Sequence, residues 1–153
     1  MKIADLQHAT HKYEELKKVF SNFLDQCNER LKNNDIVRVS VTVSDDKTSA
    51  VLYMLGRSFR VSFYIARVND KILGVLESAA IEPQKDDDDV FLWRTYFDTL
   101  GNVKSTPEAS SSFHTIQDQI FLGVLLCETI NRYFTMLEDR LKMESPLIEP
   151  EHL

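Results

Sequence analysis

The chain has 153 residues and a mass of 17.7 kDa, the size of one ordinary domain. Apolar residues make up 43% and charged residues 27%, fractions typical of a globular protein and not of a disordered or collagenous one. The net charge of −6 argues against nucleic acid as the main partner, because phosphate binding needs a surplus of Lys and Arg. The four glycines are too widely spaced to form a phosphate-binding loop.

The first element predicted is a long helix. Apolar residues repeat every seven positions at Leu6, Tyr13, Phe20 and Cys27, and others widen the stripe. This heptad pattern predicts a helix over about residues 4–32 that packs along its whole length.

The apolar period then changes to two residues, which indicates β-structure. Five strands are predicted at residues 36–44, 48–55, 59–65, 71–80 and 90–97, and residues 103–106 can add a short sixth. Because the turns between the first four are short, neighbouring strands must run antiparallel as a meander. Residues 82–89 contain five acidic residues and one lysine, a net charge of −4, and are expected to form an exposed loop.

A second long helix is predicted near the end of the chain. Its apolar residues again recur every seven positions, at Phe113, Ile120, Cys127, Phe134 and Leu141, with Ile116, Ile130 and Leu137 between them. Gly123 occupies the remaining position of this pattern and permits close backbone approach. We expect the helix to be capped at Ser112 or Thr115. Residues 144–153 contain two prolines and are expected to be a flexible tail.

Together these elements predict a single α+β domain over residues 1–143. An antiparallel meander of five to six strands is flanked by the long N-terminal and C-terminal helices, in two layers. The last helix and the strand at 90–97 carry more apolar side chains than one small core needs. Such a surplus marks a subunit interface or partner groove, unless loops or the tail cover it. The candidate interface residues are Phe91, Trp93, Phe121, Leu122, Leu125 and Leu126, with the acidic run Asp86, Asp87, Asp88 and Asp89.

Two groups of residues that contain histidine are candidate sites of chemistry. His8, His11 and Glu15 share an outer helix face and could hold a metal, but the spacing differs from the usual His-x-x-x-His chelate, so a solvated face is favoured. His114 lies beside the serines at 110–112, which suggests a nucleophile and base, but serine at a helix start is normally a cap.

Charged groups offer two further candidates. The run of aspartates at 86–89 lacks the alternating ligands and glycine of a calcium loop, so a solvated loop is favoured over a contact with a basic partner. Arg38, Arg60 and Arg67, with Tyr64, are predicted on the polar face of the sheet. They could bind an anion there if the first and third strands are neighbours, but cross-strand pairing with Asp or Glu is favoured.

The two cysteines, Cys27 and Cys127, both fall on helix stripes and are expected to be buried, reduced thiols, with a disulfide between the helices as the alternative. No secretory signal precedes the first helix, and no uninterrupted apolar run reaches membrane-spanning length. The sequence therefore predicts a cytoplasmic protein.

No paired carboxylates, Cys/His metal set or nucleophile elbow is recognisable, so we expect no cofactor and lean toward a non-enzyme. The predicted function is a small interaction protein, such as an adaptor, inhibitor, immunity or chaperone-like module. It would contact another protein and form a homodimer, without nucleic acid or membrane. The alternative is a small-molecule-binding or enzymatic domain with a pocket between the sheet and the last helix, lined by Phe63, Trp93, Tyr96, Phe97 and Phe121.

Overall fold

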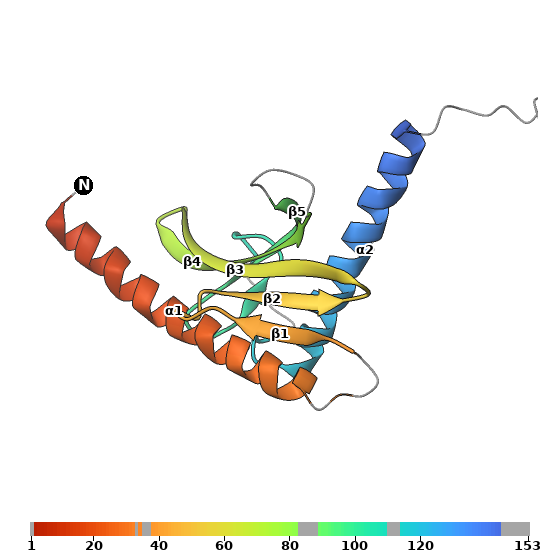
Figure 1. The fold of residues 1–153 in the computed structure, drawn as a ribbon. Helices are drawn as coiled ribbons and strands as arrows, with labels where there is room; N and C mark the ends of the chain where they lie inside the picture. Colours follow the sequence, from red (N-terminus) through yellow and green to blue (C-terminus); the bar gives the residue numbers. More distant parts are fainter. Residues whose placement is uncertain (1, 33, 35–37, 83–88, 110–113, 145–153) are drawn as a thin grey trace, which may run out of the picture.

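The computed structural model describes residues 2–32, 34, 38–82, 89–109 and 114–144. Its elements are α1 (Ile3–Lys32), β1 (Ser40–Val43), β2 (Ser49–Met54), β3 (Arg57–Val68), β4 (Lys71–Ile81), β5 (Val90–Phe97), β6 (Val103–Lys104) and α2 (Gln119–Glu144). The six strands form one sheet in chain order, each antiparallel to its neighbours (Figure 1). The predicted α+β fold with two flanking helices is confirmed.

The core lies between the inner face of the curled sheet and the two helices. Phe20 of α1 is fully buried, and its ring centroid lies 5.4 Å from that of Phe63 on β3 and 6.4 Å from that of Phe97 on β5. Alternation along β2 and β3 places the remaining inner side chains, such as Leu52 and Phe59, directly opposite each other. The seven-residue stripe of α1 therefore packs mainly on the sheet.

Short turns connect the strands because the residues at them tolerate left-handed backbone. Asn69 and Asp70 both have positive φ angles, 50° and 61°, which is the requirement of a two-residue hairpin turn. Leu55 and Gly56 also have positive φ, 53° and 72°, and this turn leaves the Leu55 side chain exposed.

A β-bulge changes which side chains share a face of β5. The pairing between β4 and β5 shifts between Ser78 and Ala79, so that Ser78 lies opposite Trp93 and Ala79 lies opposite Phe91. The extra residue rotates the strand locally. Trp93 therefore faces inward while Phe91 faces outward, although simple alternation predicts that they share a face.

The start of α2 also differs from the prediction. Thr115 pairs with Asn102 in an isolated bridge, and Ile116 N donates to Gly101 O at 2.7 Å, so this segment is extended beside β6. The helix begins at Gln119, where Asp118 Oδ1 accepts a hydrogen bond from the Ile120 amide at 3.0 Å. Asp118 is thus the cap in place of Thr115. Ser112, the other predicted cap, is outside the described residues.

The two helices cross but do not pair along their stripes. They meet near Phe23 and Phe121, whose ring centroids are 5.7 Å apart. The N-terminal turns of α1 and the C-terminal turns of α2 both extend past the sheet (Figure 1). Ile3, Leu6, Leu141 and Met143 in these extensions are exposed.

Candidate functional site

One face of α2 is fixed against the sheet. Phe121 and Leu125 are buried in the core, and Tyr133 packs edge-on against Phe59 at 5.2 Å between ring centroids. Thr129 donates a hydrogen bond to Ser78 on β4 at 3.1 Å. These contacts set the rotation of the helix, and so decide which side chains point away from the sheet.

The opposite face of α2 carries an apolar stripe that the fold leaves partly uncovered, since Ile130 and Leu137 within it pack against the core. Ile120 is 61% exposed, Phe134 47% and Leu141 63%, and Cys127 is exposed as well. With the positions between them, the spacing alternates three and four residues over the helix, the pattern of a coiled-coil seam. We call these residues the α2 stripe: Ile120, Gly123, Cys127, Ile130, Phe134, Leu137 and Leu141.

An apolar groove runs beside the α2 stripe. It has a volume of about 770 Å³ and separates Gly123, Cys127 and Ile130 from the residues just before β1 and at the end of β2. Leu55, at the β2–β3 turn, is 70% exposed beside it. We call this the α2 groove; its lining residues are Arg38, Val39, Met54, Leu55, Gly123, Leu126, Cys127, Ile130 and Asn131.

The predicted interface residues are divided among several environments. Phe121, Leu122 and Leu125 are buried core residues, and Trp93 packs inward with its ring centroid 6.5 Å from that of Phe121. Leu126 lines the α2 groove. Only Phe91, which is 51% exposed, is an open apolar side chain, and it lies on the outer face of the sheet. The predicted residues therefore do not form one continuous surface.

The acidic run and the arginines form no single site among the described residues. Asp89 pairs with Arg60 on the outer face of β3, whereas Asp86, Asp87 and Asp88 are outside the described residues. β2 lies between β1 and β3, so Arg38 and Arg60 are not neighbours. Arg67 alternates onto the other face from Arg60 and pairs with Asp70. The favoured interpretation, ordinary ion pairing, holds for Arg60.

A polar and aromatic cluster occupies the outer face of the sheet. Glu77 accepts hydrogen bonds from Tyr64 Oη at 2.8 Å and from Arg94 at 3.1 Å, and the Arg94 guanidinium lies 4.7 Å from the Phe91 ring centroid. Partial burial and the bond to Glu77 raise the pKa of Tyr64. The Arg94 guanidinium lies over the Phe91 ring, and this cation–π contact explains why a phenylalanine is tolerated at the surface.

The two groups that contain histidine have different surroundings among the described residues. His11 Nε2 lies 2.6 Å from Glu15, while His8 is exposed one turn earlier. Across the described parts of the chain, no three His, Cys, Asp or Glu residues are grouped closely enough to hold a metal. The backbone carbonyl of His114 accepts a bond from Val103 N at 3.0 Å, and the serines at 110–112 lie outside the described residues.

The two cysteines differ from each other. Cys27 is buried in the core, and burial raises its pKa from 9.0 to about 12. Cys127 is free as well but exposed, because it belongs to the α2 stripe. The expectation that both thiols are buried is therefore wrong for Cys127.

The aromatic residues expected to line a ligand pocket mostly fill the core. Phe63, Phe97 and Phe121 are buried, and Phe63 and Phe97 lie 6.0 Å apart between ring centroids. Tyr96 alternates onto the other face of β5. An apolar hollow between the sheet and α2 does exist, but Val39, Met54 and Leu55 line it instead. One feature of the sequence could have indicated this lining: the turn at Leu55–Gly56 has a leucine where turn residues are usually polar.

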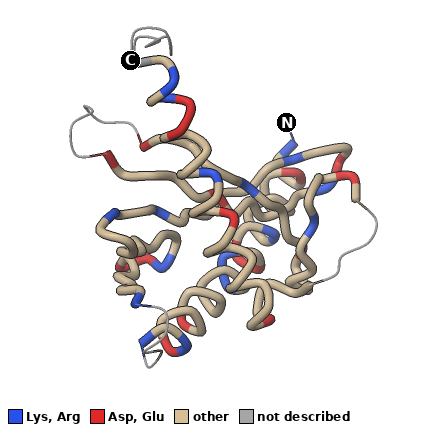
Figure 2. Tube along the Cα trace, turned by 90° about the vertical axis from the view of Figure 1, so that its right-hand side faces the viewer, with Lys and Arg blue, Asp and Glu red and all other residues tan. Residues whose placement is uncertain are grey.

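Charge does not gather by sign on the described surface. Positions of Lys and Arg are interspersed with those of Asp and Glu along the described trace (Figure 2). The α2 groove contains a single charged lining residue, Arg38. Its recognition chemistry is therefore mainly apolar.

No protein-family model matches this chain, and neither the curated proteins nor the solved structures include a significant match. By length and composition alone, Gln119–Met143 is apolar enough to span a membrane, which the sequence expectation did not anticipate. Glu128 and Arg132 lie within that segment and pair across one helical turn at 3.5 Å. A helix with one face in a protein core meets the same criterion, and α2 has such a face.

Proposed function

We propose that this protein is a small interaction protein that works through the α2 groove, and that its first partner is a second copy of itself. The observation that carries the proposal is the three-and-four spacing of the α2 stripe, in which Ile120, Cys127, Phe134 and Leu141 are exposed while Ile130 and Leu137 are partly buried. A buried helix face needs only apolar residues of suitable volume, whereas a regular seam along an exposed face is what a second helix recognises.

The α2 stripe is self-complementary in size. Gly123 has open space where a side chain would stand, with nothing within 4 Å of an added Cβ. Phe134 is the bulkiest exposed member of the stripe. If two copies of α2 lie antiparallel about a two-fold axis near its middle, Phe134 of each copy meets the Gly123 region of the other. Closed two-fold contacts of this kind are the commonest in soluble oligomers.

The area also favours a partner that fills the groove. A helix of 26 residues is about 39 Å long and about 10 Å wide, so the stripe alone supplies roughly 400 Å² per copy. A stable interface needs roughly 800 Å² per partner. A partner must therefore also cover exposed surface beside the stripe, such as Leu55 at the edge of the α2 groove, since Val39 and Met54 are already buried.

The charges of α2 and of the whole chain argue against a membrane or nucleic acid as the partner. Helices that lie on membranes flank their apolar face with Lys and Arg, which attract anionic lipid. Exposed positions of α2 include Glu138 and Asp139 as well as Arg132 and Lys142, and the whole chain carries −6. Nucleic acid is disfavoured for the same reason. An acidic protein whose groove is mainly apolar, with Arg38 as its one charged lining residue, is best suited to another protein.

The exposed thiol of Cys127 tests this proposal because it lies inside the stripe, while Cys27 is buried. We expect its reaction rate with a thiol reagent to fall as protein concentration rises, because the partner helix covers it. The Phe134→Glu variant should react quickly at every concentration. A Cys127 rate that is independent of concentration in the native protein would overturn the proposal.

A small apolar ligand is the second candidate for the same groove. The volume of about 770 Å³ is within the range of small-molecule sites, and the lining is mainly apolar. A fluorescent apolar probe should then bind with one site per chain, and Leu55→Ser should abolish the signal. If the first proposal is correct, probe binding instead weakens as the protein is concentrated, because the second copy displaces it.

A further inference from the structure

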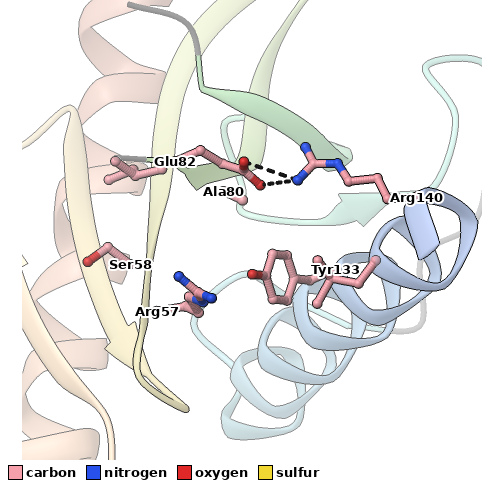
Figure 3. Close-up of a pocket in the computed structure, with 8 residues that line it drawn as sticks. Arg57, Ser58, Ala80, Glu82, Tyr133 and Arg140 are labelled. Carbon is pink, nitrogen blue, oxygen red and sulfur yellow. Dashed lines mark hydrogen bonds and ion pairs between the residues drawn. The ribbon is translucent and has the colours of Figure 1, made fainter. Parts of the chain in front are cut away.

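A second hollow lies along the same helix, between α2 and the ends of β3 and β4. It has a volume of about 270 Å³. Figure 3 shows the guanidinium of Arg57 and the hydroxyl of Tyr133 pointing into a common space beside the ion pair of Glu82 and Arg140. Arg140 Nη1 lies 2.8 Å and 3.1 Å from the two carboxylate oxygens of Glu82.

Two polar groups in this hollow have no partner within the described residues. The Arg57 side chain makes no ion pair or hydrogen bond there, as is also true of Arg30 and Arg38, whereas Arg60, Arg67, Arg94, Arg132 and Arg140 are paired with acidic side chains. The Tyr133 hydroxyl likewise makes no hydrogen bond, although its ring is held by Phe59. The guanidinium of an exposed arginine and a tyrosine hydroxyl therefore face the hollow without a partner among the described residues.

The charge of the lining selects the ligand class. Two guanidinium groups and one carboxylate leave a net charge of +1, which matches a single carboxylate and not a doubly charged phosphate. A guanidinium presents its N–H groups in a planar fork that fits the two oxygens of a carboxylate. Ala80, Ile81 and Leu137 supply apolar walls, which suit the aliphatic stem of an acidic side chain.

We propose that this hollow binds a peptide carboxylate, the Asp or Glu side chain or C-terminus of a partner, between the Arg57 guanidinium and the Tyr133 hydroxyl. Arg140 is held by Glu82 at the edge of the site and keeps the local charge positive. The site is separate from the α2 groove and does not depend on the proposed function. It would give a partner lying along α2 a polar anchor next to an apolar seam.

Titration of the full-length protein with a capped peptide containing one glutamate, followed by the Nε–Hε resonances of its arginines, tests the site. The matched peptide has glutamine in place of glutamate, and sodium acetate is a third probe. We expect the glutamate peptide to shift the Arg57 resonance with saturation and the glutamine peptide to leave it unchanged. Arg57→Gln should weaken binding at least tenfold, and Tyr133→Phe should weaken it severalfold while keeping the ring contact with Phe59.

The control variant is Arg67→Gln, which removes the same charge from the opposite end of β3. Equal weakening by Arg57→Gln and Arg67→Gln would overturn the proposal, because it would show only a general charge effect. If acetate shifts the Arg57 resonance and the glutamate peptide does not, the proposal is also overturned, in favour of a free carboxylate. The Asp86→Asn, Asp87→Asn, Asp88→Asn triple variant tests whether the chain's own acidic run occupies the hollow. If only this variant, and not the wild type, binds the glutamate peptide, the run is the occupant and the proposal of a partner's carboxylate is overturned. Failure of the peptide to bind would not change the expected dependence of Cys127 reactivity on protein concentration.

Discussion

Thr129 on α2 and Ser78 on β4 share a hydrogen bond of 3.1 Å, and both side chains are fully buried. A polar pair inside an apolar layer is satisfied only in one rotation of the helix. That rotation turns Leu125 and Tyr133 toward the sheet and Cys127 and Phe134 away from it. The exposed stripe is thus a consequence of the same contact that fixes the helix.

Loss of this bond should be costly and non-additive. Thr129→Val keeps the shape but leaves the Ser78 hydroxyl buried without its donor, which we expect to lower the free energy of unfolding by about 1–3 kcal/mol. Adding Ser78→Ala should cost less than it does in the wild type, because the orphaned hydroxyl is then removed. Urea denaturation of the four proteins in the cycle measures the coupling. Strict additivity would show that the pair does not fix the helix.

Alanine substitutions at Gly74 and Gly123 are expected to change the stability of the fold in opposite directions. A Cβ at Gly74 would lie 2.3 Å from the Phe97 ring, so Gly74→Ala should destabilise the fold by about 1–3 kcal/mol or more. A Cβ at Gly123 meets nothing within 4 Å and replaces glycine within a helix, so Gly123→Ala should stabilise it by about 0.5–1 kcal/mol. Thermal unfolding of both variants at low concentration checks this. A loss of stability in Gly123→Ala would mean that the space is already filled.

These two glycines also illustrate what the sequence could and could not predict. The position of Gly123 in the heptad was visible, because the pattern is local to one helix. Gly74 carries no such signal, since its constraint comes from Phe97 on the next strand. The same limit applies to the bulge between Ser78 and Ala79, which separated Phe91 from Trp93.

The fold class was predictable because alternation and heptads are properties of neighbouring residues. The orientation of α2 was not, because α2 is apolar around most of its circumference. Only tertiary contacts, above all Thr129 with Ser78, decide which apolar side is covered. The hollow between α2 and the ends of β3 and β4 could not be predicted for a related reason. Arg57 and Tyr133 are far apart in sequence and come together only where α2 packs beside the sheet.

The buried thiol should be chemically silent until the protein unfolds. Burial raises the pKa of Cys27 from 9.0 to about 12, so its thiolate is scarce at neutral pH. The native protein should therefore react with one equivalent of Ellman's reagent, at Cys127, and with two in urea. Because the folded state binds this proton more tightly, Cys27 contributes stability that is present below pH 9.0 and lost as the pH rises toward about 12. In Cys27→Ala this part of the alkaline loss should disappear; two rapidly reacting thiols in the native protein would contradict the assignment.

Sedimentation velocity of the wild type, Phe134→Glu and Phe91→Glu over a range of micromolar concentrations tests the central claim most directly. Both phenylalanines are about half exposed, so either charge is tolerated in the folded chain, which circular dichroism verifies. Only Phe134 belongs to the α2 stripe. The account predicts that the wild type and Phe91→Glu sediment as dimers while Phe134→Glu sediments as a monomer. A wild type that stays monomeric at every concentration, or a dimer that Phe134→Glu leaves intact, would contradict it.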